Sequence, residues 1–334
     1  AGSVDFNMLK SSFKNRCSGI VAGCSCQFLI LPLLGFVTAK AFDLEDLYGI
    51  ALITTTASPG GAYSNWWCWV MNADLALSLA MTTCSTLASC IFMPVNILVY
   101  TSIAYGDTPT MDWLRLLINI CVAMAGILTG TLLSANLPSK RGLCNIIGNV
   151  SGVTLIIFGA VFTSRDDPLW DKTAKFYIAV SIPCLLGLIV SFTVAFLIPW
   201  LSKPEAVAIT VETVYQNTGL ALSIILATFG ADDQGKAAGV PLYYSLVQVV
   251  VLPLFLISCW KAGFTYAPPN SSVWKIVVQD WQPTVPNPKI ELPGEGTDQP
   301  MSEMMANVAP MPPVDANLIE PTAANKNVIG HAEP

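Results

Sequence analysis

One acidic residue stands inside an apolar stretch of this sequence, and its neighbourhood is the strongest candidate for chemistry. Glu212 lies in the run VETVYQN (211–217), with no Lys or Arg in the same apolar stretch to neutralise it. A charged side chain inside a membrane crossing costs roughly 2.5 to 3.5 kcal/mol on insertion scales. Gln216 follows four residues later on the same helical face, so carboxylate and amide oxygens can converge on a hard cation. A protonated acid, or a position at the membrane interface, is the alternative for Glu212.

A second stretch joins helix breakers to oxygen-bearing side chains. The run ASPGGAYSN (57–65) contains one proline and two glycines. Proline removes a backbone donor and glycine weakens a helix, so we expect the chain to unwind here. Irregular backbone inside a membrane is tolerated only where protein buries it or where it lines a cavity. Because Ser64 and Asn65 follow directly, the stretch is typical of the ion sites of broken-helix transporters. A kink in a packed helix is the alternative.

A third segment supports the first two. Ser78 and Thr82 are four residues apart in an apolar run that follows Asp74, so a helix would place both hydroxyls on one face. Hydroxyls in membrane helices also bond to their own backbone or to a neighbouring helix, which is the alternative for these two. Asp74 is predicted to cap the amino end of this helix. The three segments together indicate a cation-coupled transporter or a channel.

The elements that must position these residues are predicted to be membrane helices. Of the 334 residues, 53% are hydrophobic and only 11% are charged, against roughly 25% charged residues in ordinary soluble domains. A crossing takes about 20 apolar residues, so the sequence predicts an all-α polytopic membrane protein of about eight helices. The predicted crossings are 17–39, 46–71, 75–101, 113–135, 144–163, 175–201, 205–229 and 240–260.

Composition divides the chain into three parts. Residues 1–16 are predicted to be a cytoplasmic segment, 17–262 the transmembrane transporter domain and 263–334 a disordered tail. The tail holds 12 of the 23 prolines and, with 3 Lys against 8 acidic residues, a net charge of −5. Such a composition cannot bury enough apolar surface to form a core. Three basic residues before the first crossing, and an even number of crossings, place the tail in the cytoplasm.

Residue content excludes several classes of function. His331 is the only histidine and lies in the tail, so histidine-based catalysis and most histidine-bearing metal sites are excluded from the apolar body. The sequence contains no basic patch interleaved with aromatic residues, which is the pattern that would indicate nucleic-acid binding. The ten cysteines show no zinc-type spacing. We therefore expect no enzyme, no nucleic-acid partner and no organic cofactor.

Five ordered motifs resemble the sodium/bile acid cotransporter family, and the resemblance covers the chain from about Asp5 to Lys261. A single Pro-Gly-Gly would carry little weight, but five separate blocks in the family's order are specific. The blocks are Cys26-Gln27-Phe28 with Pro32-Leu33 and Gly35-Phe36; Pro59-Gly60-Gly61 with Ser64-Asn65; Asp74 with Leu77-Ser78 and the run from Met81 to Thr86; Val211-Glu212-Thr213 with Gln216-Asn217; and Pro241-Leu242 with Tyr244-Ser245 and Gln248.

The resemblance implies a bundle of nine or ten helices in two inverted repeats, divided into a core domain and a panel domain. Two broken helices of the core would cross near mid-membrane, with two sodium ions behind the crossing. Because Glu212 would belong to both sites, its charge would offset part of two positive charges. The first sodium site would use Ser64, Asn65, Ser78, Thr82 and Glu212, and the second would use Gln27, Glu212 and Gln216 with backbone oxygens near Thr213 and Tyr215.

On this resemblance, the chain is expected to be a multi-pass secondary active transporter in the lipid of the plasma membrane. It would couple sodium influx to uptake of an amphipathic organic anion, a bile acid or sulfated steroid, with Asn217 as the candidate substrate contact. Two features depart from the family: on this resemblance we expect the chain to begin after the family's first panel helix, and the run WWCW (66–69) is unusually aromatic. A carrier of another small organic anion, or a non-transporting, receptor-like member that acts through its tail, is the alternative.

Overall fold

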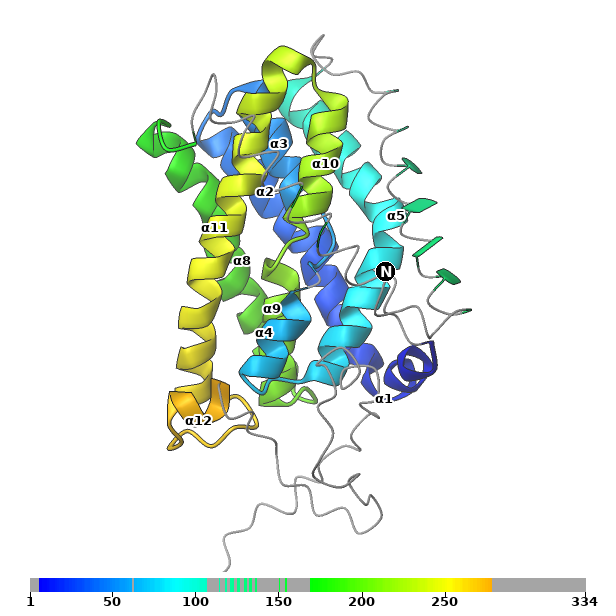
Figure 1. Cartoon of the computed structure of the whole chain (residues 1–334), viewed down its shortest axis with the longest axis vertical. Coiled ribbons are helices and arrows are strands. Elements are labelled where there is room, and N and C mark those ends of the chain that lie inside the picture. The colour runs from blue at the N-terminus through cyan, green and yellow to red at the C-terminus, as the bar shows by residue number, and fades with distance from the viewer. Residues whose placement is uncertain are drawn as a thin grey trace, which may run out of the picture.

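The computed structural model describes residues 6–61, 63–106 and 169–277, with single helical positions between 114 and 154, and every regular element in these ranges is a helix (Figure 1). The predicted crossings 113–135 and 144–163 lie outside the described residues, apart from those single positions. In chain order the elements are α1 (Phe6–Ser25), the π-helix η1 (Cys26–Ile30), α2 (Leu31–Ala41), α3 (Asp46–Thr56), α4 (Ser64–Val70), α5 (Leu75–Tyr105), α8 (Ala174–Leu197), α9 (Lys203–Val214), α10 (Thr218–Thr228), α11 (Ala231–Lys261) and α12 (Val273–Val277).

Four helical spans are long and apolar enough to cross a membrane. They coincide with the predicted crossings 17–39, 75–101, 175–201 and 240–260, and they confirm the predicted all-α membrane class. The division into core and panel domains stays a prediction. The spans are Arg16–Ala41, which runs from α1 through η1 to α2, then Leu75–Tyr105, Ala174–Leu197 and Asp233–Lys261.

The first span contains a π-helical turn, η1, that the sequence did not predict. In such a turn each N–H bonds to the carbonyl five residues back, so the turn holds an extra residue. Gln27 lies in this turn with 1% of its surface exposed, and its Nε2 donates to the carbonyl of Ser58 at 2.9 Å. The wider turn therefore coincides with the place where a polar side chain enters the interior.

The predicted crossings 46–71 and 205–229 are each broken into two short helices. Residues 57–63 separate α3 from α4, and residues 215–217 separate α9 from α10. In Figure 1, α3 and α10 lie in the upper part of the bundle and α4 and α9 in the lower part, and contacts join α3 to α10 and α4 to α9. The two breaks therefore lie at the same level, where the broken helices cross.

Helix α9 lies at the centre of the described bundle. Every residue from Ala206 to Val214 is buried, and the helix packs against α1, α5 and α8. A capping box fixes its start, because the carboxylate of Glu205 accepts a hydrogen bond from the N–H of Ser202 at 2.8 Å. A helix that is buried on every side and mostly apolar belongs to a core, so Glu212 is held in the middle of the bundle.

At one end of the bundle, Arg16, Asp74 and Tyr266 join three distant segments. Arg16 has non-helical backbone angles (φ −133°, ψ 23°), and its guanidinium forms an ion pair with the buried carboxylate of Asp74. Asp74 caps α5, as predicted, by accepting from the N–H of Leu77 at 2.9 Å. The Tyr266 hydroxyl donates to Asp74 at 3.1 Å. Burial, and then the Asp74 carboxylate, raise the pKa of Tyr266, so its hydroxyl stays protonated at ordinary pH.

The described structure continues past residue 263, where the predicted disordered tail begins. Residues 263–277 fold back on the bundle, and the N–H of Tyr266 donates to the carbonyl of Asn72 at 2.9 Å. The indole of Trp260 donates to the carbonyl of Pro268 at 3.0 Å, and Ile276 is buried. The ordered part of the chain therefore extends beyond the predicted boundary, because these residues find partners on the α4–α5 turn and on α11.

We predict that Tyr266→Phe lowers the free energy of unfolding by about 1 kcal/mol, the usual value of one hydrogen bond. Asp74→Asn should cost about 3 kcal/mol, because it leaves the Arg16 guanidinium without its charged partner. Denaturant unfolding of the purified protein in detergent measures both. Tyr63→Phe, at an exposed tyrosine, is the control. A Tyr266→Phe protein as stable as this control would show that the bond to Asp74 contributes nothing.

Candidate functional site

Three hydroxyl groups surround the carboxylate of Glu212, which is 1% exposed. Ser64 Oγ donates to Glu212 Oε1 at 2.7 Å, and Ser78 Oγ donates to the same oxygen. Thr82 Oγ1 donates to Glu212 Oε2 at 2.9 Å. Within the part of the chain that the structure describes, no Lys, Arg or His forms an ion pair with Glu212. Neutral donors alone therefore compensate its burial.

Asn65 completes the first group of predicted residues. Its Nδ2 donates to Thr82 Oγ1 at 3.0 Å, and its Oδ1 accepts from Ser78 Oγ at 2.8 Å. The side chains come from three helices, with Ser64 and Asn65 at the start of α4, Ser78 and Thr82 one turn apart on α5, and the carboxylate on α9. The expectation that Ser78 and Thr82 share a face is confirmed, and that face is turned toward Glu212.

The hydroxyl protons in this cluster are fewer than the acceptors around them. Ser64 Oγ also lies 2.7 Å from the carbonyl of Gly61, and Thr82 Oγ1 lies 3.0 Å from the carbonyl of Ser78. Each hydroxyl carries one proton and so serves one acceptor at a time. A cluster in which oxygen acceptors outnumber protons, and which includes a negative charge, is the ligand set that a hard cation prefers.

The two unwound segments pair with each other. The N–H of Gly61 donates to the carbonyl of Tyr215, and the N–H of Asn217 donates to the carbonyl of Pro59, both at 2.8 Å. These bonds form a short antiparallel bridge between Gly60 and Gln216. A break in a buried helix leaves backbone groups without partners, which is costly in a dry interior. Here each break satisfies groups that the other one exposes.

A second polar group lies beside the same crossing. Ser58 links its members, because its carbonyl accepts from Gln27 Nε2 at 2.9 Å and its Oγ donates to Gln216 Oε1 at 3.2 Å. Gln216 Nε2 donates to the carbonyl of Thr213 at 2.6 Å. Gln27, Ser58 and Gln216 are all buried. Side-chain and backbone oxygens therefore collect here as well, and Gln216 stands four residues after Glu212.

Glycine at positions 60 and 61 permits the close approach of the two segments. A Cβ atom added at Gly60 would lie 2.9 Å from Glu212 Oε2 and 3.2 Å from the Glu212 carbonyl oxygen. A Cβ added at Gly61 would lie 2.9 Å from the ring of Tyr215 and 3.0 Å from the carbonyl oxygen of Gln216. Steric contact, rather than a left-handed backbone, excludes a side chain here.

The predicted site residues all lie at or beside the crossing. Thr213, Tyr215 and Asn217 differ from the others, because their contacts are made by backbone carbonyls or by a side chain that caps a helix. Thr213 and Tyr215 offer backbone carbonyls, as predicted, while the Thr213 hydroxyl donates to its own helix at the Ile209 carbonyl at 2.8 Å. Asn217, the candidate substrate contact, is the N-cap of α10, and its Oδ1 accepts from the N–H of Leu220 at 3.0 Å. Whether any of these groups binds sodium or substrate stays a prediction.

Sequence reasoning missed Ser58 and Gln248 as members of the site. Gln248 Oε1 accepts from the backbone N–H of Gln216 at 3.0 Å. The signal for Gln248 was an amide within the apolar run LVQVVVL (246–252) of α11, since such a group needs a partner inside a membrane protein. Ser58 carried a weaker signal, its place directly before Pro59.

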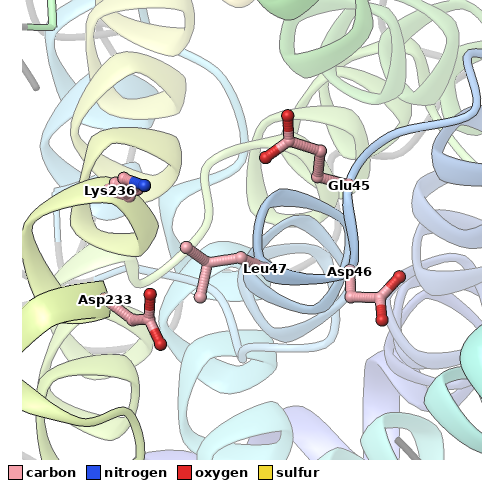
Figure 2. A pocket seen from close by; sticks show the side chains of 5 residues that line it. All are labelled: Glu45, Asp46, Leu47, Asp233 and Lys236. Carbon is pink, nitrogen blue, oxygen red and sulfur yellow. The ribbon is translucent and has the colours of Figure 1, made fainter. Parts of the chain in front are cut away.

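A surface pocket lies away from the crossing, between the starts of α3 and α11 (Figure 2). None of the predicted site residues lines it. The candidate site is thus a packed polar cluster inside the bundle. The pocket is lined by Glu45, Asp46, Leu47, Asp233 and Lys236.

Membrane-length helices, with two broken helices that cross beside a buried carboxylate, define a polytopic membrane protein of the broken-helix type. Comparison with known proteins agrees. Residues 3–166 match the sequence profile of the Sodium Bile acid symporter family. The ileal sodium/bile acid cotransporters of Oryctolagus cuniculus and Homo sapiens are 29% and 28% identical, each over 71% of this chain and 69% of their own length. The sodium-dependent organic anion transporter of Rattus norvegicus is 28% identical over 70% of this chain and 63% of its own length.

Residues 3–166 of the chain are thus similar to the Sodium Bile acid symporter family. The resemblance that the five sequence motifs indicated is therefore confirmed, and the protein is an integral membrane protein. The names of the relatives, at 26–29% identity, specify two different substrates, bile acid in one case and organic anion in the other.

We predict that Gly60→Ala lowers the free energy of unfolding by about 1 to 3 kcal/mol, because the new methyl group overpacks the crossing against the Glu212 carboxylate. Gly230→Ala is the matched control, since nothing lies within 4 Å of a Cβ added at Gly230. Denaturant unfolding in detergent measures both variants. Equal stability of the two would show that the crossing can widen at no cost.

Proposed function

We propose that the protein couples the inward movement of sodium to the uptake of an amphipathic organic anion. The observation that carries the proposal is the buried carboxylate of Glu212, which three hydroxyls contact and no basic side chain in the described ranges pairs with. Such a group binds a cation because the cation supplies the missing positive charge. The names of the relatives, sodium/bile acid cotransporter and sodium-dependent organic anion transporter, support sodium as this cation.

The first proposed sodium site is the cluster of Ser64, Asn65, Ser78, Thr82 and Glu212. Sodium is a hard cation and takes neutral oxygens together with a carboxylate. As it binds, the hydroxyls of Ser64 and Thr82 would turn their protons to the carbonyls of Gly61 and Ser78, the other acceptors within their reach. Their lone pairs would then face the ion. The protein therefore need not move its backbone to change from hydrogen bonding to ligation.

The second proposed sodium site lies on the other side of Glu212, at the unwound turn. Gln27 and Gln216 would supply amide oxygens there, and Thr213 and Tyr215 would supply backbone carbonyls. Support comes from the short links that already gather these groups around Ser58 and Thr213. Because both sites would share Glu212, binding of one ion lowers the negative charge available to the next.

The proposed energy source is the sodium gradient together with the membrane potential. Each elementary charge that crosses 100 mV yields about 2.3 kcal/mol. Two sodium ions carried with one monovalent anion move a net positive charge inward, so transport would be electrogenic. In the proposed cycle, sodium closes the crossing region, and the core domain then moves against the panel domain to expose the substrate to the other side of the plasma membrane.

The proposed substrate is a bile acid or a sulfated steroid, both of which join a large apolar body to one anionic group. Asn217 remains the candidate contact. It is half-buried, and because its Oδ1 is committed to the cap of α10, it would offer its Nδ2 amide to the anionic end. Tyr63 and Trp66 are exposed near the start of α4 and add apolar surface close to the crossing.

We predict that Glu212→Gln abolishes sodium-dependent uptake of labelled taurocholate or a labelled sulfated steroid by cells that express the protein. Glu205→Gln is the matched control, since it makes the same change in the capping box of the same helix and should keep the sodium dependence. Uptake is compared with sodium or choline outside the cells, at equal surface expression. Sodium-dependent uptake that survives in Glu212→Gln would overturn the proposal.

We further predict that Thr82→Val raises the half-saturating sodium concentration about tenfold, since the variant keeps the volume but loses one oxygen ligand. Thr83→Val is the control, because the Thr83 hydroxyl donates only to its own helix, at the carbonyl of Leu79 at 2.9 Å. Uptake measured against sodium concentration separates the two. The same half-saturating concentration in both variants would remove Thr82 from the sodium site.

A further inference from the structure

Gln248 is a fully buried amide on the long helix α11, with 1% of its surface exposed. It stands in a run of apolar residues, two of which, Val249 and Val250, are exposed on the outer face of the helix. An amide inside a membrane-spanning segment is expensive unless both its oxygen and its nitrogen find partners. The partners of Gln248 therefore indicate why it is there.

Both ends of the Gln248 amide contact the backbone of the same residue, Gln216. Oε1 accepts from the Gln216 N–H at 3.0 Å, and Nε2 donates to the Gln216 carbonyl at 3.5 Å. In an unbroken helix this N–H would bond to the carbonyl of Glu212, four residues back. The break removes that partner, and a side chain from another helix replaces it.

The neighbours of Gln216 are held in a different way. The N–H of Tyr215 still donates within α9, to Val211 at 2.9 Å, and the N–H of Asn217 donates to Pro59 across the crossing at 2.8 Å. Of the three residues 215–217, Gln216 alone has its backbone N–H bound by a side chain of α11. The orientation of the Gln216 backbone therefore depends on Gln248.

We infer that Gln248 is a positioning residue that sets the sodium affinity of the second proposed site. Within the described part of the chain, its hydrogen bonds go to the Gln216 backbone and not to a side-chain atom proposed as a sodium ligand. It thereby fixes the backbone from which the Gln216 side chain and the neighbouring carbonyls extend. It also joins α11 to the unwound turn, so a displacement of α11 changes the site. This inference rests on the proposed function, because it assigns a role within a sodium site.

The test compares Gln248→Met with Gln234→Met. Methionine keeps the length and volume of the side chain but cannot form the hydrogen bonds to the Gln216 backbone. Gln234 is a matched control because it too extends from α11 to backbone carbonyls, those of Leu226 at 2.7 Å and Phe229 at 3.1 Å, away from the crossing. Two readouts are taken: the sodium concentration that gives half of the thermal stabilisation of the purified protein, and the half-saturating sodium concentration of uptake.

The expected result is that Gln248→Met raises both sodium concentrations about fivefold, as the loss of one hydrogen bond predicts. Gln234→Met should lower the melting temperature without changing either concentration. If Gln248→Met does not yield folded protein, Gln248→Asn withdraws the amide by one methylene and should weaken sodium binding in the same way.

Two results would overturn the inference, and they differ from each other. Sodium concentrations unchanged in Gln248→Met, or raised equally in Gln234→Met, would show that Gln248 has only a structural role, while the wild type still responds to sodium. If sodium neither raised the melting temperature of the wild-type protein nor increased its uptake, the proposed function itself would be overturned, and the role of Gln248 with it.

Discussion

One carboxylate, Glu212, is buried with no basic partner among the described residues, and the rest of the site depends on this constraint. Taking such a group out of water costs several kcal/mol, and hydrogen bonds to a charged acceptor recover part of this cost. Those bonds come from Ser64 on α4 and from Ser78 and Thr82 on α5. Three helices are therefore held in register by a single side chain of α9, and the same side chain leaves the cluster with an unbalanced negative charge.

The crossing solves a second problem, the backbone groups that a broken helix exposes. Residues 57–63 and 215–217 are far apart in the chain, yet Gly61 and Asn217 each donate to the opposite segment. This reciprocal pairing requires the absence of side chains at Gly60 and Gly61. The packing that brings the two segments together also brings Glu212 beside Ser64, so backbone satisfaction and the geometry of the polar cluster have one cause.

Much of the site follows from local sequence, and the rest depends on distant contacts. Residue types alone predicted the break around Pro59 and the polar cluster beside it. The signals were the cost of burying Glu212, the helical spacing of Ser78 and Thr82, and the helix breakers around Pro59. The break at 215–217 contains no proline or glycine, and only the family resemblance indicated it. Three features were not predicted: the turn η1, the hydrogen bonds from Gln248 to the Gln216 backbone, and the bond from Tyr266 to Asp74. Each depends on a partner that becomes a neighbour only in the folded chain.

The bond between Tyr266 and Asp74 has a consequence for the order in which the protein assembles. These residues are 192 positions apart, whereas Arg16 and Asp74 both belong to the first part of the chain. Synthesis proceeds from the amino end, and contacts between distant segments must wait for the whole intervening chain. The ion pair can form early, but Tyr266 can reach Asp74 only after α11 has been made. The contacts of Asp74 at this end of the bundle are therefore completed only after α11, long after α5, the helix that Asp74 caps, has been made.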